Sequence, residues 1–207
     1  MRNYVDLSTI YPNSIQFNNC TLSKETNKIL ASPDIVNFYG VGDFINQFDF
    51  QYNLKEETLG NERYIMDTGP FEMVTNKYFI DNAFGDVLIF GLGVGFIVFP
   101  LLNDETVTSI TIVDNNQDII DYIGGVVAQQ DINNKVNIVL GDVLDYHNHI
   151  QEGTSFDFIY FDYWDKLTID AYNEMNSVKL LYTNYLRDMD SIIYCWCQDI
   201  QNLIILE

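Results

Sequence analysis

Basic residues are scarce in this chain of 207 residues, whereas acidic residues are abundant. Ten lysines and arginines stand against thirty aspartates and glutamates, so the formal net charge is -20. This charge repels the phosphates of nucleic acids and of anionic lipids, and we expect neither nucleic acid nor a membrane surface as a partner. An acidic surface serves solubility, and it also suits a basic site on a protein partner.

Cysteines are few, and both a long unbroken apolar run and a leader-like start are missing. The longest apolar run, residues 87–102, is interrupted by glycines and a proline, whereas a membrane helix needs about 20 apolar residues. The first residues lack the basic start and apolar stretch of a signal peptide. The cysteines have no spacing typical of a disulfide framework; they are Cys20, Cys195 and Cys197. A reduced, cytoplasmic protein is therefore predicted.

The residue pattern predicts two parts of the chain with a boundary near residue 70. Residues 1 to about 60 are polar and rich in asparagine, without a linker or an internal repeat. Residues 48–54 and 62–67 predict two strands of a hairpin around the turn "KEETLGN". The next apolar positions, over residues 71–84, have helical spacing. We expect an N-terminal extension with a β-hairpin over residues 1–70 and a second domain over residues 71–207.

The second domain alternates short β-rich runs with segments of helical pattern. Such continuous apolar strands indicate a parallel sheet that is covered on both faces. The runs are "DVLIF" (86–90), "SITIVD" (109–114), "VNIVLGD" (136–142), "FDFIYFD" (156–162) and "SIIYCWC" (191–197). The predicted fold class is α/β, a Rossmann-like parallel sheet with helices on both faces, and its ligands are expected at the carboxyl ends of the strands.

The first of these strands ends in a glycine loop, G-x-G-x-G, formed by Gly91, Gly93 and Gly95. A loop of this kind between a strand and a helix is expected to bring bare backbone N–H groups up to a ligand. The dinucleotide fingerprint has its third glycine one place later, where this chain has Phe96. No lysine follows as a P-loop requires. Neither a dinucleotide nor a nucleoside triphosphate is therefore favoured, and tight packing of strand on helix is an alternative reason for the glycines.

An aspartate closes each of the next three strands. Asp114 follows Gly91 at a distance suited to accepting both hydrogen bonds of a ribose diol. Asp142 is placed to meet an adenine amino group, and Asp162 to lie beside the reacting atoms. Each of these aspartates alone is more often a helix N-cap or a solvated loop residue, whereas a suitable group at each of four successive strand ends favours a binding site.

Four segments together, "DVLIFGLGVG", "ITIVDNN", "VNIVLGD" and "FDFIYFD", resemble class I S-adenosylmethionine-dependent methyltransferases, in particular their spermidine synthase-like branch. The resemblance extends over residues 62–197 and implies S-adenosylmethionine as the cofactor. It implies that the backbone of the three glycines contacts the methionine end and the sugar of the cofactor. It also implies that the stretch "ERYIMDTGPFEM" forms the hairpin and the segment at the entrance of the site, before the sheet. The implied cofactor-binding residues are Gly91, Gly93, Gly95, Asp114, Asn115, Asp142, Val143 and Asp162.

Methyl transfer from a sulfonium is an in-line displacement, so the protein has mainly to align donor and acceptor and to exclude water. A general base is needed where the acceptor has to lose a proton. Asp162 and Asp165 are the catalytic candidates, and Tyr163 and Trp164 between them offer an aromatic face to a cation. A capped loop with two packing aromatics is the alternative reading of this stretch.

The chain departs at several places from the pattern of the families that it resembles. Aminopropyltransferases carry a paired Asp-Glu where this chain has Asn76 and Lys77, and a lysine there would repel a cationic amine. Phe90 replaces the acid that many methyltransferases have before the first glycine. Only ten residues follow the fifth strand, so we expect a C-terminally truncated sheet and, through its exposed edge, a homodimer.

Four functions remain open on the sequence. The first is an S-adenosylmethionine-dependent methyltransferase that acts on a small-molecule or protein acceptor. The second is a catalytically silent module of the same fold that binds a basic partner. The third is an aminopropyltransferase-like enzyme, and the fourth is an enzyme that breaks down S-adenosylmethionine without an acceptor. No metal site is expected, because His147 and His149 point to different sides of a helix, and because Asp162 and Asp199 alone do not define a magnesium site.

Overall fold

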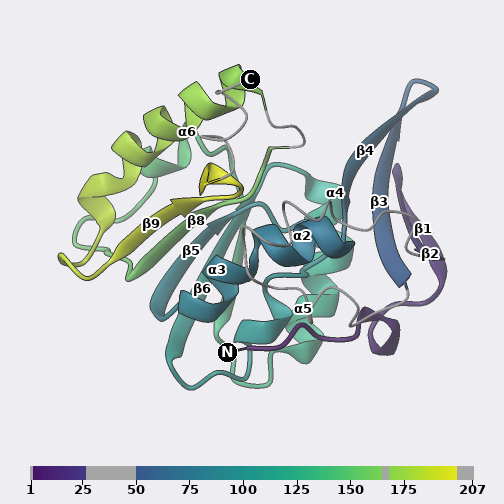
Figure 1. The fold of residues 1–207 in the computed structure, drawn as a ribbon, viewed down its shortest axis with the longest axis horizontal. Coiled ribbons are helices and arrows are strands. Elements are labelled where there is room, and N and C mark those ends of the chain that lie inside the picture. The colour runs from purple at the N-terminus through teal and green to yellow at the C-terminus, as the bar shows by residue number, and fades with distance from the viewer. Residues whose placement is uncertain (1, 27–49, 165–167, 200–207) are drawn as a thin grey trace.

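The computed structural model describes residues 2–26, 50–164 and 168–199. An antiparallel sheet and a parallel sheet stand side by side, with the antiparallel sheet at the right in Figure 1. In the antiparallel sheet the strand order follows the chain: β1 (Ser14–Phe17), β2 (Cys20–Thr26), β3 (Phe50–Thr58) and β4 (Asn61–Asp67).

The predicted hairpin is present as β3 and β4. Its turn is the dipeptide Leu59-Gly60, shorter than the expected seven-residue turn, because β3 continues through residue 58. Both turn residues have positive φ, 53° and 78°, as the tight turns that match the twist of a hairpin require. The strands β1 and β2 were not predicted, because their many polar residues obscure the alternation of apolar and polar positions that is typical of a half-buried strand.

The parallel sheet confirms the predicted Rossmann-like fold. Its strands are β5 (Gly85–Phe90), β6 (Val107–Asp114), β7 (Val136–Leu140), β8 (Phe158–Phe161) and β9 (Ile192–Cys195). They pair in the order β7-β6-β5-β8-β9, and every pair is parallel. The order reverses between β5 and β8, and the crevice outside the carboxyl ends of two such strands is where ligands bind in open α/β sheets.

Helices cover both faces of the parallel sheet, because successive strand residues face opposite sides. On one side, Val87 and Ile89 of β5 belong to a core that the helices before and after the strand complete. On the other side, Leu88 and Phe90 pack with the long helix α6 (Figure 1). The helices are α2 (Pro70–Thr75), α3 (Lys77–Asn82), α4 (Gln117–Ile119), α5 (Gly125–Gln130) and α6 (Ile169–Tyr182), with a π-turn, Ile120–Gly124, joining α4 to α5.

Two predicted helices are replaced by short turns. After the glycine loop the chain forms turns and one 3₁₀ turn, Phe99–Leu101, because Gly93 and Gly95 adopt positive φ and Pro100 offers no N–H. After β7 only the 3₁₀ turn Tyr146–Asn148 forms. The glycine loop consequently has no helix N-terminus behind it, and the expectation of one is wrong.

The two sheets share one hydrophobic core. Tyr11, before β1, donates a hydrogen bond to the carbonyl oxygen of Val94 at 2.9 Å, and Tyr52 of β3 donates to the carbonyl oxygen of Tyr11 at 3.0 Å. The N-terminal extension thus holds the segment after β5, while the domain boundary at residue 70 stays a prediction. Among the helices of the described ranges, none combines the length and apolarity that crossing a membrane requires.

A buried hydrogen bond joins the junction of α2 and α3 to strand β8 of the parallel sheet. The Tyr160 hydroxyl on β8 donates to Asn76 Oδ1 at 2.6 Å, and Asn76, between α2 and α3, is 0% exposed. We predict that Tyr160→Phe lowers the free energy of unfolding by about 1–3 kcal/mol, because the Asn76 oxygen is left without this donor. Urea denaturation measures the change. Tyr78→Phe, at a residue that is 40% exposed, is the control and should change stability by less than about 0.5 kcal/mol. Equal effects of the two variants would contradict the role of Tyr160.

Candidate functional site

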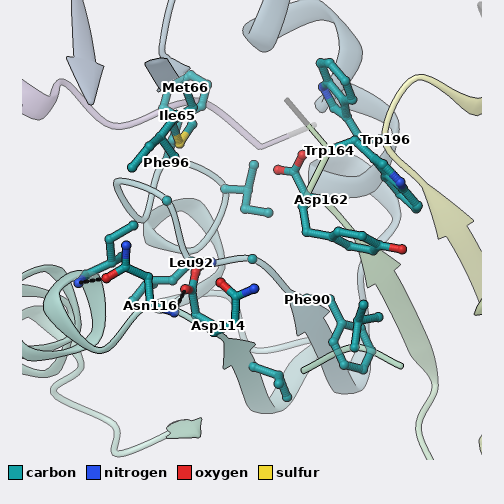
Figure 2. Close-up of a pocket in the computed structure, with 18 of the residues that line it drawn as sticks. Ile65, Met66, Phe90, Leu92, Phe96, Asp114, Asn116, Asp162, Trp164 and Trp196 are labelled. Carbon is teal, nitrogen blue, oxygen red and sulfur yellow. Dashed lines mark hydrogen bonds between the residues drawn. The ribbon is translucent and has the colours of Figure 1, made fainter. Parts of the chain in front are cut away.

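A cavity opens at the carboxyl ends of the parallel strands, at the reversal between β5 and β8. It is lined by the ends of β5, β6 and β8, by the glycine loop, by residues 63–67 of β4 and by the beginning of α2. Figure 2 shows Asp114 and Asp162 on opposite sides of this cavity, with Met66 and Phe96 on the hairpin side. The location is the one predicted from the strand pattern.

Gly91 brings the strand ends β5 and β8 into close contact. Its φ is 102°, and a Cβ at this position would lie 2.0 Å from the carbonyl oxygen of Asp162. The Asp162 amide donates to the Phe90 carbonyl at 2.8 Å, directly beside this contact. Glycine is required here for conformation and for space, and Asp162 is fixed next to the glycine loop as a result.

Asp114 holds the glycine loop from the other side. One carboxylate oxygen accepts the Leu92 amide at 2.8 Å, and the other accepts the Asn116 amide at 2.8 Å. Burial raises the pKa of Asp114, and these amide hydrogen bonds oppose that rise. A carboxylate has about four lone-pair sites, and the backbone amides of Gly93 and Asn115 also contribute hydrogen bonds to Asp114, so the amides of the strand ends take up its accepting capacity. Asp114 also lines the cavity. Its predicted place in the site is thus retained, together with a structural role that the sequence does not show.

The amides of the glycine loop are engaged within the protein, which corrects the expectation of bare N–H groups. Gly91 donates to the Val113 carbonyl, Leu92 to Asp114, and Gly95 to the Leu92 carbonyl. The Gly93 amide also contributes a hydrogen bond to Asp114, and the Val94 amide donates to the thioether sulfur of Met66 at 3.3 Å. A phosphate group would find no free cluster of amides between residues 91 and 95.

Glu72 is a site residue that the sequence reasoning missed. It lies in the first turn of α2, lines the cavity and accepts the side-chain amide of Asn76 at 2.9 Å. Asn76 in turn accepts from Tyr160, so a buried hydrogen-bond chain sets the position of the carboxylate. In the sequence, the acidic residue of the segment "PFEM" could have pointed to this role. The apolar periodicity of the segment, however, predicts only an ordinary amphipathic helix.

Glu72 and Asp162 form the acidic end of the cavity. Burial, together with the charges of Asp162 and Asp67, raises the pKa of Glu72 well above its usual value. Burial likewise raises the pKa of Asp162 to about 7. Each carboxyl group therefore holds its proton more firmly than it would in water. A cation bound between the two groups would lower both pKa values and so favour loss of the protons.

The aromatic residues after β8 are tied to α6. The Tyr163 hydroxyl and the Trp164 indole N–H both donate to Glu174, each at 3.1 Å. The two rings lie 4.0 Å apart between centroids, and both line the cavity. Trp196, after β9, also lines it and donates to Thr75 Oγ1 at 2.9 Å. The predicted aromatic face is thus present beside Asp162, and Trp196 extends it.

The other predicted residues divide into three groups. Asn115 and Val143 line the cavity, as do Gly91 and Gly93. Asp142 and Gly95 do not line it: the Asp142 carboxylate accepts the Leu144 amide at 2.8 Å, and a Cβ at Gly95 would meet Phe99 and Val127. Asp165 lies outside the described residues.

The side chain of Lys77 is directed away from the cavity, contrary to the expectation that it would repel a bound amine. Its ammonium group pairs with Asp81 one turn later on α3 and donates to the Arg2 carbonyl at 3.3 Å. The helical spacing explains the pairing, because Lys77 and Asp81 stand four residues apart on α3. Within the described ranges, no group of three or more histidine, cysteine and acidic side chains is arranged to hold a metal ion.

No protein-family model and no curated protein matches the chain. Solved structures match at low identity. A spermidine synthase from Thermotoga maritima matches at 17% identity with a TM-score of 0.44, over 68% of this chain and 52% of that chain. A SAM-dependent methyltransferase from Geobacter sulfurreducens in complex with S-adenosyl-L-homocysteine matches at 16% identity with a TM-score of 0.43, over 60% of this chain and 47% of that chain. A precorrin 8w decarboxylase from Methanobacterium thermoautotrophicum matches at 15%, with a TM-score of 0.42 and 56% of each chain.

The chain spans about half the length of these three proteins. The likeness concerns the fold alone. Strand order, parallel pairing and helices on both faces define the class, a Rossmann-like α/β protein with an antiparallel N-terminal sheet. The structures that the chain matches include a spermidine synthase and a SAM-dependent methyltransferase.

We predict that Asp162 makes the protein less stable as the pH rises. Its folded-state pKa of about 7 exceeds the ordinary value of 3.8, so between these values the folded chain keeps a proton that the unfolded chain has lost. Its contribution to stability is complete below the ordinary value and is lost as the pH rises through about 7. In thermal denaturation, Asp162→Asn should gain several °C relative to the wild type between about pH 4 and about pH 8. A constant difference between the two proteins would show that Asp162 titrates normally.

Proposed function

We propose that the cavity binds an adenosyl sulfonium, S-adenosylmethionine or a close relative, and that the protein transfers a group from it to a small-molecule or protein acceptor. The observation that carries this proposal is the charge of the lining. Among the described residues, four acidic residues line the cavity, Asp67, Glu72, Asp114 and Asp162, whereas the lining includes one basic residue, Arg63. Arg63 lies at the rim, with its side chain 61% exposed.

This charge selects against anionic ligands and in favour of cations. The engaged amides of the glycine loop remove the usual means of binding a phosphate, and the carboxylates add repulsion. A sulfonium has the opposite charge and gains from Asp162 and Glu72 in a partly buried setting. The faces of Trp164 and Trp196 add attraction for a cation.

The nucleoside part of such a ligand has partners on the β6 side of the cavity. The ribose lies beside Asp114 and Asn115, which both line the cavity, and its hydroxyls share the Asp114 carboxylate with the loop amides. Ile119 and Val143 provide apolar surface on which an adenine ring can pack. These residues fit the cofactor that the fold suggests, although Asp142 contributes no lining atom.

A bound sulfonium supplies an electrophilic carbon for in-line displacement. The protein's own task is to position the acceptor and to take its proton. Asp162 is suited to the second task, because a carboxyl with a pKa of about 7 exchanges protons near neutral pH. Glu72 helps to orient a cationic or hydrogen-bonding acceptor, since Asn76 and Tyr160 fix its carboxylate.

Transfer of an aminopropyl group is a second candidate function. The position of Lys77 favours it, because the ammonium group that argued against an amine acceptor pairs with Asp81 outside the cavity. Glu72 supplies a carboxylate in its place. Product analysis with an adenosyl sulfonium and a diamine separates aminopropyl transfer from methyl transfer.

We predict that ligand affinity depends on the charge of Asp162. In calorimetric titrations at about pH 8, Asp162→Asn should weaken binding of the cationic S-adenosylmethionine about tenfold and should weaken neutral S-adenosylhomocysteine less. For the wild type, binding of S-adenosylmethionine should tighten between about pH 6 and about pH 8, as Asp162 loses its proton. The dependence should be weaker in the variant, in which Glu72 is the remaining carboxylate of raised pKa in the cavity.

The matched control is Asp170→Asn, which removes the same charge from an exposed position in the first turn of α6. This variant should bind both ligands as the wild type does. Equal losses for the two ligands in Asp162→Asn would contradict a cation site, and absence of binding to any adenosyl ligand would contradict the proposed function as a whole.

A further inference from the structure

Glu56 of β3 joins the antiparallel sheet to the β6 side of the cavity. One of its carboxylate oxygens accepts the side-chain amide of Asn116 at 2.9 Å, and Asn116 lines the cavity. The other oxygen lies 4.0 Å from the guanidinium group of Arg63, which is the partner of Glu56 in the β3–β4 ladder. The Glu56 side chain is 21% exposed, so its hydrogen bond to Asn116 is shielded from much of the solvent.

Asn116 holds this end of the cavity with three groups. Its backbone amide donates to Asp114 at 2.8 Å, and its side-chain oxygen accepts the amides of Asp118 and Ile119 at 3.0 and 3.3 Å. The third group is the side-chain amide that Glu56 accepts. Figure 2 shows Asn116 next to Asp114, and Ile119 lines the same cavity. Asn116 thus fixes both the end of β6 and the beginning of α4.

The Glu56 carboxylate sets the orientation of the Asn116 side chain. An asparagine can present either its oxygen or its NH₂ group to a neighbour, whereas a carboxylate only accepts hydrogen bonds. With Glu56 in place, the NH₂ group is directed to β3, and the oxygen is directed to the helix amides. Without this acceptor, the Asn116 side chain is free to turn, and the residues that depend on it are held less firmly.

Two further contacts place the antiparallel sheet against the same helical segment. Asn18, between β1 and β2, donates to Asp118 at 2.8 Å. The Phe17 ring stacks on Tyr122, which belongs to the π-turn after α4, with 4.4 Å between the ring centroids. These contacts hold the helical segment, whereas Glu56 acts on a residue that lines the cavity.

We propose that Glu56 is a positioning residue for the nucleoside part of the bound ligand. It acts through Asn116, whose orientation keeps Asp114 and Ile119 where the ribose and the adenine ring bind. The antiparallel sheet is thus part of the binding site, although β3 itself contributes no residue to the lining. This inference rests on the proposed function, since it requires that an adenosyl ligand occupies the cavity.

The test is a calorimetric titration with adenosine and with S-adenosylmethionine, which share the nucleoside and differ in charge. Glu56→Ala should weaken both ligands equally, about tenfold, because the loss concerns their shared part. Glu56→Gln should bind both ligands within about twofold of the wild type, because the glutamine oxygen still accepts the Asn116 amide. The matched control is Glu57→Ala, which removes the same charge from the next, exposed position of β3 and should bind as the wild type does.

A double-mutant cycle tests the route through Asn116. Once Asn116→Ala has removed the side-chain amide, Glu56→Ala should weaken adenosine no further.

An exchange of donor and acceptor covers the case in which the alanine variants do not fold. Asn116→Asp keeps an oxygen for the helix amides but places a second carboxylate against Glu56, and it should weaken adenosine about tenfold. Adding Glu56→Gln supplies a donor to that carboxylate and should return the affinity to within about twofold of the wild type.

The outcomes separate the two proposals. If the wild type binds both ligands and Glu56→Ala binds them as tightly, the role of Glu56 is overturned and the proposed function stands. A loss that is larger for S-adenosylmethionine than for adenosine, and that Glu56→Gln shares, would show that Glu56 acts by its charge and would also overturn the role. So would additive effects in the cycle, or an exchange that restores no affinity. If neither ligand binds the wild type, the proposed function fails and the inference about Glu56 fails with it.

Discussion

The carboxylate of Asp114 fixes the carboxyl edge of the parallel sheet, and the form of the cavity depends on it. By accepting the amides of Leu92 and Asn116, it joins the ends of β5 and β6 and turns the glycine loop inward. Gly91 completes the arrangement, because only glycine permits the approach to the Asp162 carbonyl. The loop is therefore a closed structural element with engaged amides, and the chemistry of the cavity is left to the side chains around it.

Those side chains give the cavity its acidic character. The Glu72 carboxylate is set by Asn76 and, through it, by the buried Tyr160 hydroxyl, while Asp162 stands at the end of β8. Burial raises the pKa of both carboxyl groups, and a cation bound beside them would stabilise their ionised forms. The site thus differs in kind from the phosphate-binding loops that a glycine-rich strand end suggests at first sight.

Much of the fold could be predicted from the sequence, because strands buried on both faces appear as continuous apolar runs and strand ends share one edge. The positions of Asp114 and Asp162 followed from that rule. Glu72 and Met66 could not be predicted, since they reach the cavity from segments before the sheet and their direction depends on helical phase and hairpin register. The spacing along α3 likewise decides that Lys77 pairs with Asp81.

The central claim is that the cavity accepts a cationic adenosyl ligand and rejects an anionic one. The most direct measurement is a calorimetric titration of the full chain with S-adenosylmethionine and, in parallel, with nicotinamide adenine dinucleotide, which shares the adenosine but carries a pyrophosphate. The account predicts saturable binding of the sulfonium and none of the dinucleotide. Binding of the dinucleotide, or of neither ligand, would contradict it.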